Sequence, residues 1–164
     1  MADKYNDFIR LTKSYLREID YYRQSVIMLQ DRSEEMRTKL EAISAKIPAY
    51  SESVSGHSEL TQVEAEAGKR IEQERCLQRC LDDLRSLNRH IERIEACIDT
   101  LDTREQEMVT LYYRQKMTYE ELAERIGWSP RTCMRRVQEA TRHIALMLFG
   151  EKSKDNILFL EDRT

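Results

Sequence analysis

Residues that interrupt helices are scarce in this sequence. Its 164 residues include only four glycines and two prolines, whereas 40% of them are apolar and 35% are charged. Disordered and low-complexity chains are rich in glycine and proline, and this composition is far from theirs. We therefore expect a folded, helix-rich protein, built as one domain or as a small domain with an extension.

An excess of positive charge is also lacking, since the formal net charge is −3. Bulk attraction to nucleic acid is thereby excluded, and any such binding has to come from a local basic face. No apolar run approaches the roughly 18 residues of a membrane span, and residues 1–7 have no signal-peptide pattern. The sequence predicts a cytoplasmic protein with no membrane partner.

Motifs of catalysis and of metal binding are missing as well. There is no glycine-rich phosphate loop or nucleophile elbow, and the adjacent Glu120 and Glu121 are explained by a helix start. Cys76 and Cys80 could form half a metal site with His90, but structural zinc needs four convergent ligands, so a packing role is favoured. The four cysteines match no disulfide framework and are expected to be reduced. No enzyme activity, metal or cofactor is predicted.

What the sequence does contain is two long helical patterns. The first has apolar or small residues at alternating spacings of three and four, which is typical of the buried seam of an amphipathic helix. Its seam positions are Tyr5, Phe8, Thr12, Tyr15, Ile19, Tyr22, Val26, Leu29, Ser33, Met36, Leu40, Ile43 and Ile47. Because Tyr15 and Tyr22 belong to this seam, the tyrosine-rich stretch with Tyr21 is predicted to pack in a core or dimer rather than to stack on bases.

Pro48 is predicted to end this helix, and a serine-rich loop near 48–58 follows. The second seam is irregular at first and then regular: Leu60, Val63, Ala67, Ile71, Leu77, Cys80, Leu84, Leu87, Ile91, Ile94, Ile98 and Leu101. Two helices of similar length with a short connection predict an antiparallel hairpin, a coiled coil over 1–100. Two helices bury little core, so the hairpin is expected to form a homodimer or to pack on the C-terminal part.

Short helices with strong boundary signals are predicted after Leu101. Thr103 with Gln106, and Thr118 with Glu121, fit the capping box. Gly127 can end the second of these helices in the left-handed conformation. A last helix then begins at Ser129 and Pro130 and runs to about Phe149, with a buried side at Cys133, Val137, Ala140, Ile144 and Leu148. Residues 150–164 form a polar tail, in which Ile157 to Leu160 either dock on the body or remain loose.

The segment from Tyr119 to Gln138 fits a helix-turn-helix. Ala123 allows the two helices to approach closely, Gly127 permits the turn, and Cys133 is a small apolar anchor in the second helix. That second helix carries most of the local basic charge, with Arg131, Arg135, Arg136 and Arg142 against one acidic residue, Glu139. Arginine can bind guanine edges bidentately or hold phosphates, so double-stranded DNA is the predicted partner.

These residues resemble a known family. Residues 101–113 and 117–132, together with Ala140 and Ile144, closely resemble region four of bacterial sigma factors. That resemblance implies a helical module that binds the promoter −35 element, with RNA polymerase as a candidate partner. With the long N-terminal helices, the chain resembles phage and prophage transcription regulators of the ArpU type. No counterpart of sigma region two is visible, so the resemblance implies an accessory or activator role in a bacterial host cytoplasm.

The resemblance also implies which residues bind DNA. Base edges would face Arg131, Thr132, Met134 and Arg135, with Arg136 and Gln138 near the backbone. The complete predicted DNA-binding set is Ser129, Arg131, Thr132, Met134, Arg135, Arg136, Gln138 and Arg142. Arg136 departs from the family, because an apolar core residue is usual there and Val137 takes over that packing. The rotation of this helix therefore stays open by part of a turn.

Two other functions compete with a transcription regulator. Small terminase subunits, which package phage DNA, also join a helix-turn-helix to long oligomerising helices. A coiled-coil adaptor with a vestigial module is the third hypothesis. Oligomeric mass and DNA binding separate these alternatives.

Overall fold

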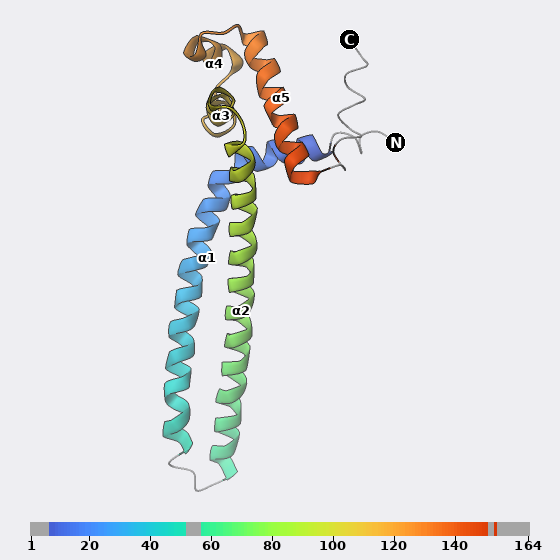
Figure 1. The fold of residues 1–164 in the computed structure, drawn as a ribbon. Coiled ribbons are helices and arrows are strands. Elements are labelled where there is room, and N and C mark those ends of the chain that lie inside the picture. Colours follow the sequence, from blue (N-terminus) through green and yellow to red (C-terminus); the bar gives the residue numbers. More distant parts are fainter. Residues whose placement is uncertain (1–6, 52–56, 151–152, 154–164) are drawn as a thin grey trace. The chain divides into compact units, whose positions relative to one another are not determined.

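The computed structural model describes residues 7–51, 57–150 and 153, with side chains from 7–45, 64–150 and 153. Within this part of the chain every regular element is helical (Figure 1). The elements are α1 (Asp7–Ser51), α2 (His57–Asp99), α3 (Thr103–Val109), η2 (Thr110–Arg114), α4 (Tyr119–Ile126) and α5 (Pro130–Phe149). This confirms the predicted fold class, a long antiparallel helical hairpin followed by short helices that include a helix-turn-helix.

The contacts divide the chain into two compact units. One unit contains the chain up to Arg23 and from Arg89 onward, and the other contains Gln24–Asn88. The short helices therefore share a core with the first turns of α1 and the last part of α2. The sequence suggested a different division, into a hairpin at 1–100, a module at 101–149 and a tail at 150–164, which stays a prediction.

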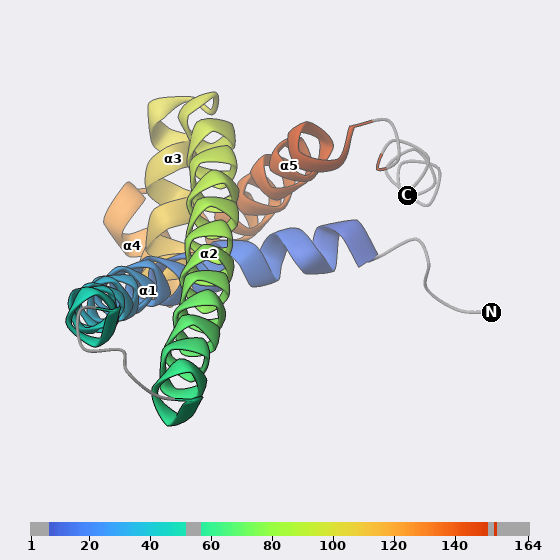
Figure 2. The ribbon, with the colours of Figure 1, turned by 90° about the horizontal axis from the view of Figure 1, so that it is seen from below.

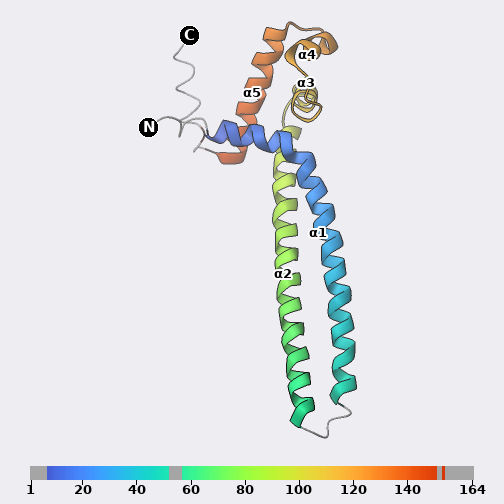
Figure 3. The same cartoon turned by 180° about the vertical axis from the view of Figure 1, so that it is seen from behind.

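The unit Gln24–Asn88 is the outer part of the hairpin, where α1 and α2 run side by side in opposite directions (Figures 1 and 3). The predicted seam is confirmed here: its members from Val26 to Ile43 and from Leu77 to Leu87 are buried or half-buried. In this unit the Cys80 thiol lies 3.5 Å from the Leu29 carbonyl oxygen. Ile71 is half exposed, so its assignment to the irregular start of the second seam is wrong.

The predicted end of the first helix at Pro48 is also wrong, because α1 continues to Ser51. Proline removes one backbone donor and crowds the preceding turn. In the last turn of a helix this affects a single hydrogen bond, while the residues that follow can still donate to carbonyls one turn back. The predicted loop near 48–58 is helical at both of its ends, and 52–56 lie outside the described residues.

In the unit that holds the short helices, α1 has a wider apolar face than its seam. Ile9 and Leu16 are buried beside the seam residues Thr12 and Ile19. The Phe8 ring packs on Phe149 of α5, with ring centroids 4.9 Å apart, and the start of α1 lies at the C-terminal end of α5 (Figures 1 and 2). The first turns of α1 are thus part of the core that supports α5.

Two of the three neighbouring tyrosines pack around His90 of α2. The rings of Tyr15 and Tyr22 lie 4.5 Å and 5.6 Å from the imidazole, both edge-on. Burial, and then the charge of Arg93, lowers the pKa of His90 below its ordinary value. Burial and the neighbouring Glu18, which accepts a hydrogen bond from the phenol, raise the pKa of Tyr22 to about 12. Tyr21 is exposed, so the predicted packing role is confirmed for Tyr15 and Tyr22, whereas packing of Tyr21 in a dimer stays a prediction.

A cluster of ion pairs connects α1, α2 and η2 in this unit. Arg114 donates to both carboxylate oxygens of Asp20, at 2.8 and 3.2 Å. Arg23 pairs with Asp20 and also with Glu95 of α2. The hydrogen bond from Arg114 is the main reason why the pKa of Asp20 lies below its ordinary value. Because these side chains are partly exposed, each ion pair contributes little to stability, about 0–1 kcal/mol.

Replacing Leu16 with alanine should lower the free energy of unfolding by about 2–5 kcal/mol, because it removes a fully buried side chain and leaves a cavity. Urea denaturation measures the loss, and hydrogen exchange of α5 amides should show that the helix-turn-helix is destabilised. Leu11→Ala is the matched control on the same helix, since Leu11 is 38% exposed, and it should cost less than about 1 kcal/mol. Equal losses in the two variants would contradict the role assigned to the first turns of α1.

Candidate nucleic-acid interface

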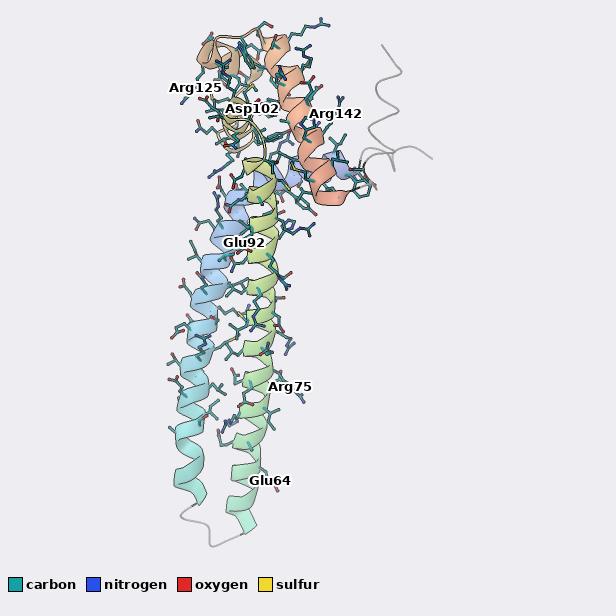
Figure 4. The ribbon with its side chains drawn as sticks, in the orientation of Figure 1. Glu64, Arg75, Glu92, Asp102, Arg125 and Arg142 are labelled. Carbon is teal, nitrogen blue, oxygen red and sulfur yellow. The ribbon has the colours of Figure 1, made fainter. Side chains whose placement is uncertain are left out.

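The first short helix, α3, is capped by Asp102 rather than by the predicted Thr103. The Asp102 carboxylate accepts a hydrogen bond from the Glu105 N–H at 2.8 Å, and Thr103 is the first helical residue (Figure 4). Aspartate is as good an N-cap as threonine and stands one position earlier, so the cap moves by one residue. The side chain of Gln106 instead donates to the carbonyls of Asp99 and Leu101, which ties α3 to the end of α2.

A π-helical turn, η2, follows α3 directly and places Tyr113 in the core against α5. The Tyr113 hydroxyl lies 2.9 Å from the Thr141 hydroxyl, and this buried hydrogen bond joins η2 to α5. Thr141 in turn donates to the Val137 carbonyl at 2.6 Å. Burial raises the pKa of Tyr113, and the Arg17 guanidinium lies 5.8 Å from the centre of its ring. α1, η2 and α5 therefore meet at one tyrosine.

The first helix of the helix-turn-helix, α4, has the predicted capping box. The Thr118 hydroxyl accepts a hydrogen bond from the Glu121 N–H at 3.3 Å, and the Glu121 carboxylate accepts one from the Thr118 N–H at 2.8 Å. The bonds from Thr118, first its backbone and then its hydroxyl, hold the pKa of Glu121 below its ordinary value. Both predicted features of this helix start are confirmed.

The turn after α4 depends on Gly127, whose φ is 78°. The Ala123 carbonyl accepts from the N–H groups of Gly127 and Trp128 at 2.9 and 3.2 Å, which closes the end of the helix. Trp128 is half-buried, and the Arg104 guanidinium of α3 lies 5.6 Å from the centre of its ring. The small Ala123 and the left-handed Gly127 thus serve the purposes predicted from their spacing.

The second helix, α5, begins at the predicted residues, and the burial of its residues shows which side of it faces the core. The Ser129 hydroxyl accepts from the Thr132 N–H at 3.2 Å, and Pro130 is the first helical residue. Val137 is 1% exposed and Arg136 is exposed, so Val137 replaces the apolar residue expected at 136. Of the predicted buried side, Cys133, Ala140 and Ile144 are also buried, and Leu148 is half-buried.

Two buried residues of α5 were not predicted, Thr141 and Ala145. Thr141 carries a hydroxyl and was therefore not expected in the core, although Tyr113 satisfies it there. A spacing of four from Val137 to Thr141 and on to Ala145 was the available signal in the sequence.

On the opposite side of α5, four predicted residues form one line. Arg131, Arg135, Gln138 and Arg142 are spaced by four, three and four positions, so they lie above one another on a helix. The first three are exposed and Arg142, labelled in Figure 4, is half-buried. We call these four residues the arginine stripe.

The remaining predicted site residues flank the arginine stripe. Thr132 and Arg136 lie on one side of it and Met134, 39% exposed, on the other. Ser129 is exposed at the start of the helix. The structure thus gathers the eight predicted residues on the solvent-facing side and amino end of α5, and its contacts with α3 and α4 hold the helix in place.

Residues 91–144 match the family model described as Sigma-70, region 4. This segment is a sigma region-four-like helix-turn-helix. The match includes the end of α2, all of α3, η2 and α4, and α5 as far as Ile144. No curated protein and no solved structure matched the chain.

A module of the sigma region-four type is a DNA-binding helix-turn-helix, and here α5 is its second helix. The acidic residues of the first turn of α4, Glu120 and Glu121, lie at a helix start, where the dipole favours them. α5 has no acidic residue in its first turn. Its amino end therefore offers backbone N–H groups and arginines without a competing carboxylate in that turn.

Two further properties concern the described part of the chain. No helix there has a stretch both long enough and apolar enough to span a membrane. The cysteines are free thiols: Cys80, Cys97 and Cys133 are buried and Cys76 is half-buried. Burial raises the pKa of the Cys97 and Cys133 thiols, as expected of packing residues.

Replacing Gly127 with alanine should lower the free energy of unfolding of the sigma-like module by about 1 kcal/mol, because a Cβ is disfavoured at positive φ. The space around Gly127 is open, so only the backbone penalty is expected. Differential scanning calorimetry of the full chain measures it.

Gly68→Ala is the control with the opposite sign. Gly68 lies inside α2 with open space around it, so alanine there should stabilise the helix by up to about 1 kcal/mol. A Gly127→Ala variant that is as stable as the parent would mean that the turn does not need its left-handed residue.

Proposed function

We propose that this protein is a transcription regulator that binds double-stranded DNA sequence-specifically, with α5 in the major groove. The observation that carries the proposal is the arginine stripe, which lies on the solvent-facing side of the second helix of a sigma region-four-like module. Basic side chains in one line on such a helix can contact both base edges and phosphates. The net charge of −3 for the whole chain makes this local concentration the relevant electrostatic feature.

Roles can be assigned along α5 from its amino end. In helix-turn-helix proteins the first turns of the second helix contact base edges. Arg131 and Arg135 therefore bind guanine edges bidentately, with Thr132 and Met134 beside them on adjacent bases. Gln138 and Arg142 lie further along the arginine stripe and contact the DNA backbone.

Two residues complete the backbone contacts. Arg136 flanks the arginine stripe on the side opposite Met134, where a guanidinium can pair with a phosphate. Ser129 and the first N–H groups of α5 provide a phosphate site at the helix start.

The biological setting proposed is a bacterial or prophage regulator in the host cytoplasm. It is supported by the sigma-like module and by the resemblance of the long hairpin plus C-terminal module to ArpU-type regulators. Within this proposal the module binds a promoter element, and the hairpin formed by α1 and α2 contacts RNA polymerase or a second copy of the chain.

Arg131→Ala and Arg135→Ala should each weaken binding to the preferred duplex by about 1–3 kcal/mol, because each removes a bidentate contact with a base. A duplex enriched from a random library by the wild-type protein provides the target, and fluorescence anisotropy measures its affinity. Arg70→Ala is the control, an exposed arginine of α2 paired with Glu74, and it should leave the affinity within twofold. Unchanged affinity in the Arg131→Ala/Arg135→Ala double variant would remove the assignment of α5 to the groove.

Wild-type affinity should also fall as salt is added, by roughly 0.9 in log K per log unit of salt for each phosphate contact. The absence of any salt-sensitive binding to duplex DNA would instead favour the coiled-coil adaptor.

Oligomeric mass tests the remaining alternative. A regulator should behave as a monomer or dimer, whereas a small terminase subunit forms a ring of many subunits. Light scattering of the full chain measures this mass directly, and a ring would replace transcription regulation with DNA packaging as the proposed role.

A further inference from the structure

One acidic residue, Glu139, occurs in the whole of α5. It stands one turn after Arg135 and Arg136 and is separated from them by four and three positions, so all three side chains are neighbours on the helix. One carboxylate oxygen of Glu139 lies 3.9 Å from Nε of Arg135, and the other lies 3.6 Å from Nη1 of Arg136. A single carboxylate therefore faces two of the arginines assigned to DNA.

The other two arginines of α5 differ in this respect. Within the described part of the chain, neither Arg131 nor Arg142 has a carboxylate at ion-pair distance, and Arg135 and Arg136 have only Glu139. The arginine stripe thus contains two arginines that are available to DNA and one, Arg135, that is paired within the helix.

Glu139 is also less exposed than its two partners. Its side chain is 37% exposed, compared with 67% for Arg135 and 45% for Arg136. A carboxylate at this position lies within a Debye length of any phosphate that the two arginines could contact. It therefore attracts their guanidinium groups and repels the DNA backbone at the same time.

We propose that Glu139 is a specificity-determining residue, which holds Arg135 and Arg136 away from the phosphates of non-preferred DNA. This inference rests on the proposed function. Non-specific binding comes almost entirely from phosphate neutralisation and counterion release, so two internally paired arginines weaken it. On the preferred duplex, a bidentate contact of Arg135 with a guanine edge replaces the pair with Glu139, and binding is retained.

Replacing Glu139 with glutamine keeps its size and removes its charge. Binding of the E139Q protein to a random-sequence duplex should become about tenfold tighter at low salt, with a steeper salt dependence by roughly 0.9 for each released arginine. Affinity for the preferred duplex should rise less, so that the ratio of preferred to random binding falls. Fluorescence anisotropy with both duplexes over a series of salt concentrations measures these changes.

The matched control is E107Q, which removes one exposed carboxylate from α3 and changes the net charge equally. It should shift both affinities alike and leave their ratio unchanged. In a second test, E139Q is introduced into the Arg135→Gln/Arg136→Gln protein. There it should no longer change the ratio, because the partners of Glu139 are gone. Thermal unfolding of each variant confirms that the compared proteins are folded.

Three results would overturn the inference. One is a ratio that E139Q and E107Q change equally, and another is an E139Q effect that persists without Arg135 and Arg136. The third is weaker binding to the preferred duplex with no gain on the random duplex, which would make Glu139 an acceptor for a cytosine amino group. If the wild-type protein binds neither duplex, the proposed function fails as well, whereas wild-type binding with an unchanged ratio in E139Q refutes this inference alone.

Discussion

The buried hydrogen bond between the Tyr113 and Thr141 hydroxyls joins η2 to the side of α5 that faces the core. Thr141 faces η2, and Val137, Ala140 and Ile144 are buried on the same side of α5. A rotation of one residue would bury a guanidinium of the solvent-facing side, at a cost of several kcal/mol if it were left unpaired. The arginine stripe therefore faces solvent because the core contains the mostly apolar residues of the other side of α5. The π-helical turn matters because it brings Tyr113 to this hydrogen bond.

Much of this arrangement is encoded locally and could be predicted. The seams of α1 and α2 follow from apolar spacing, and the capping box at Thr118, the left-handed Gly127 and the Ser129–Pro130 helix start each follow from one backbone requirement. Each of these signals involves residues within about one helical turn of one another. The local structure that it predicts therefore depends little on residues distant in sequence.

The features that could not be predicted depend on contacts distant in sequence. Ile9 and Leu16 lie off the seam of α1 and are buried because short helices from the end of the chain pack on that side. Thr141 enters the core because Tyr113, 28 residues earlier, supplies its partner. The choice of Asp102 over Thr103 is a one-residue competition between two good caps, which sequence patterns do not resolve. For the candidate site, the sequence predicted where α5 begins and which of its residues form the site. The burial of Val137 then showed which side of the helix faces the core.

The shared core of α1 and the sigma-like module also has a consequence for the order of events during synthesis. Residues up to Arg23 leave the ribosome before the residues they pack against, which begin at Arg89. Contacts so distant in sequence form slowly, because the intervening chain must be closed into a loop first. The hairpin Gln24–Asn88 shortens that loop by bringing its two ends together. The apolar face at the start of α1 therefore stays uncovered until α3, η2 and α5 have been synthesised, and the shared core forms only then.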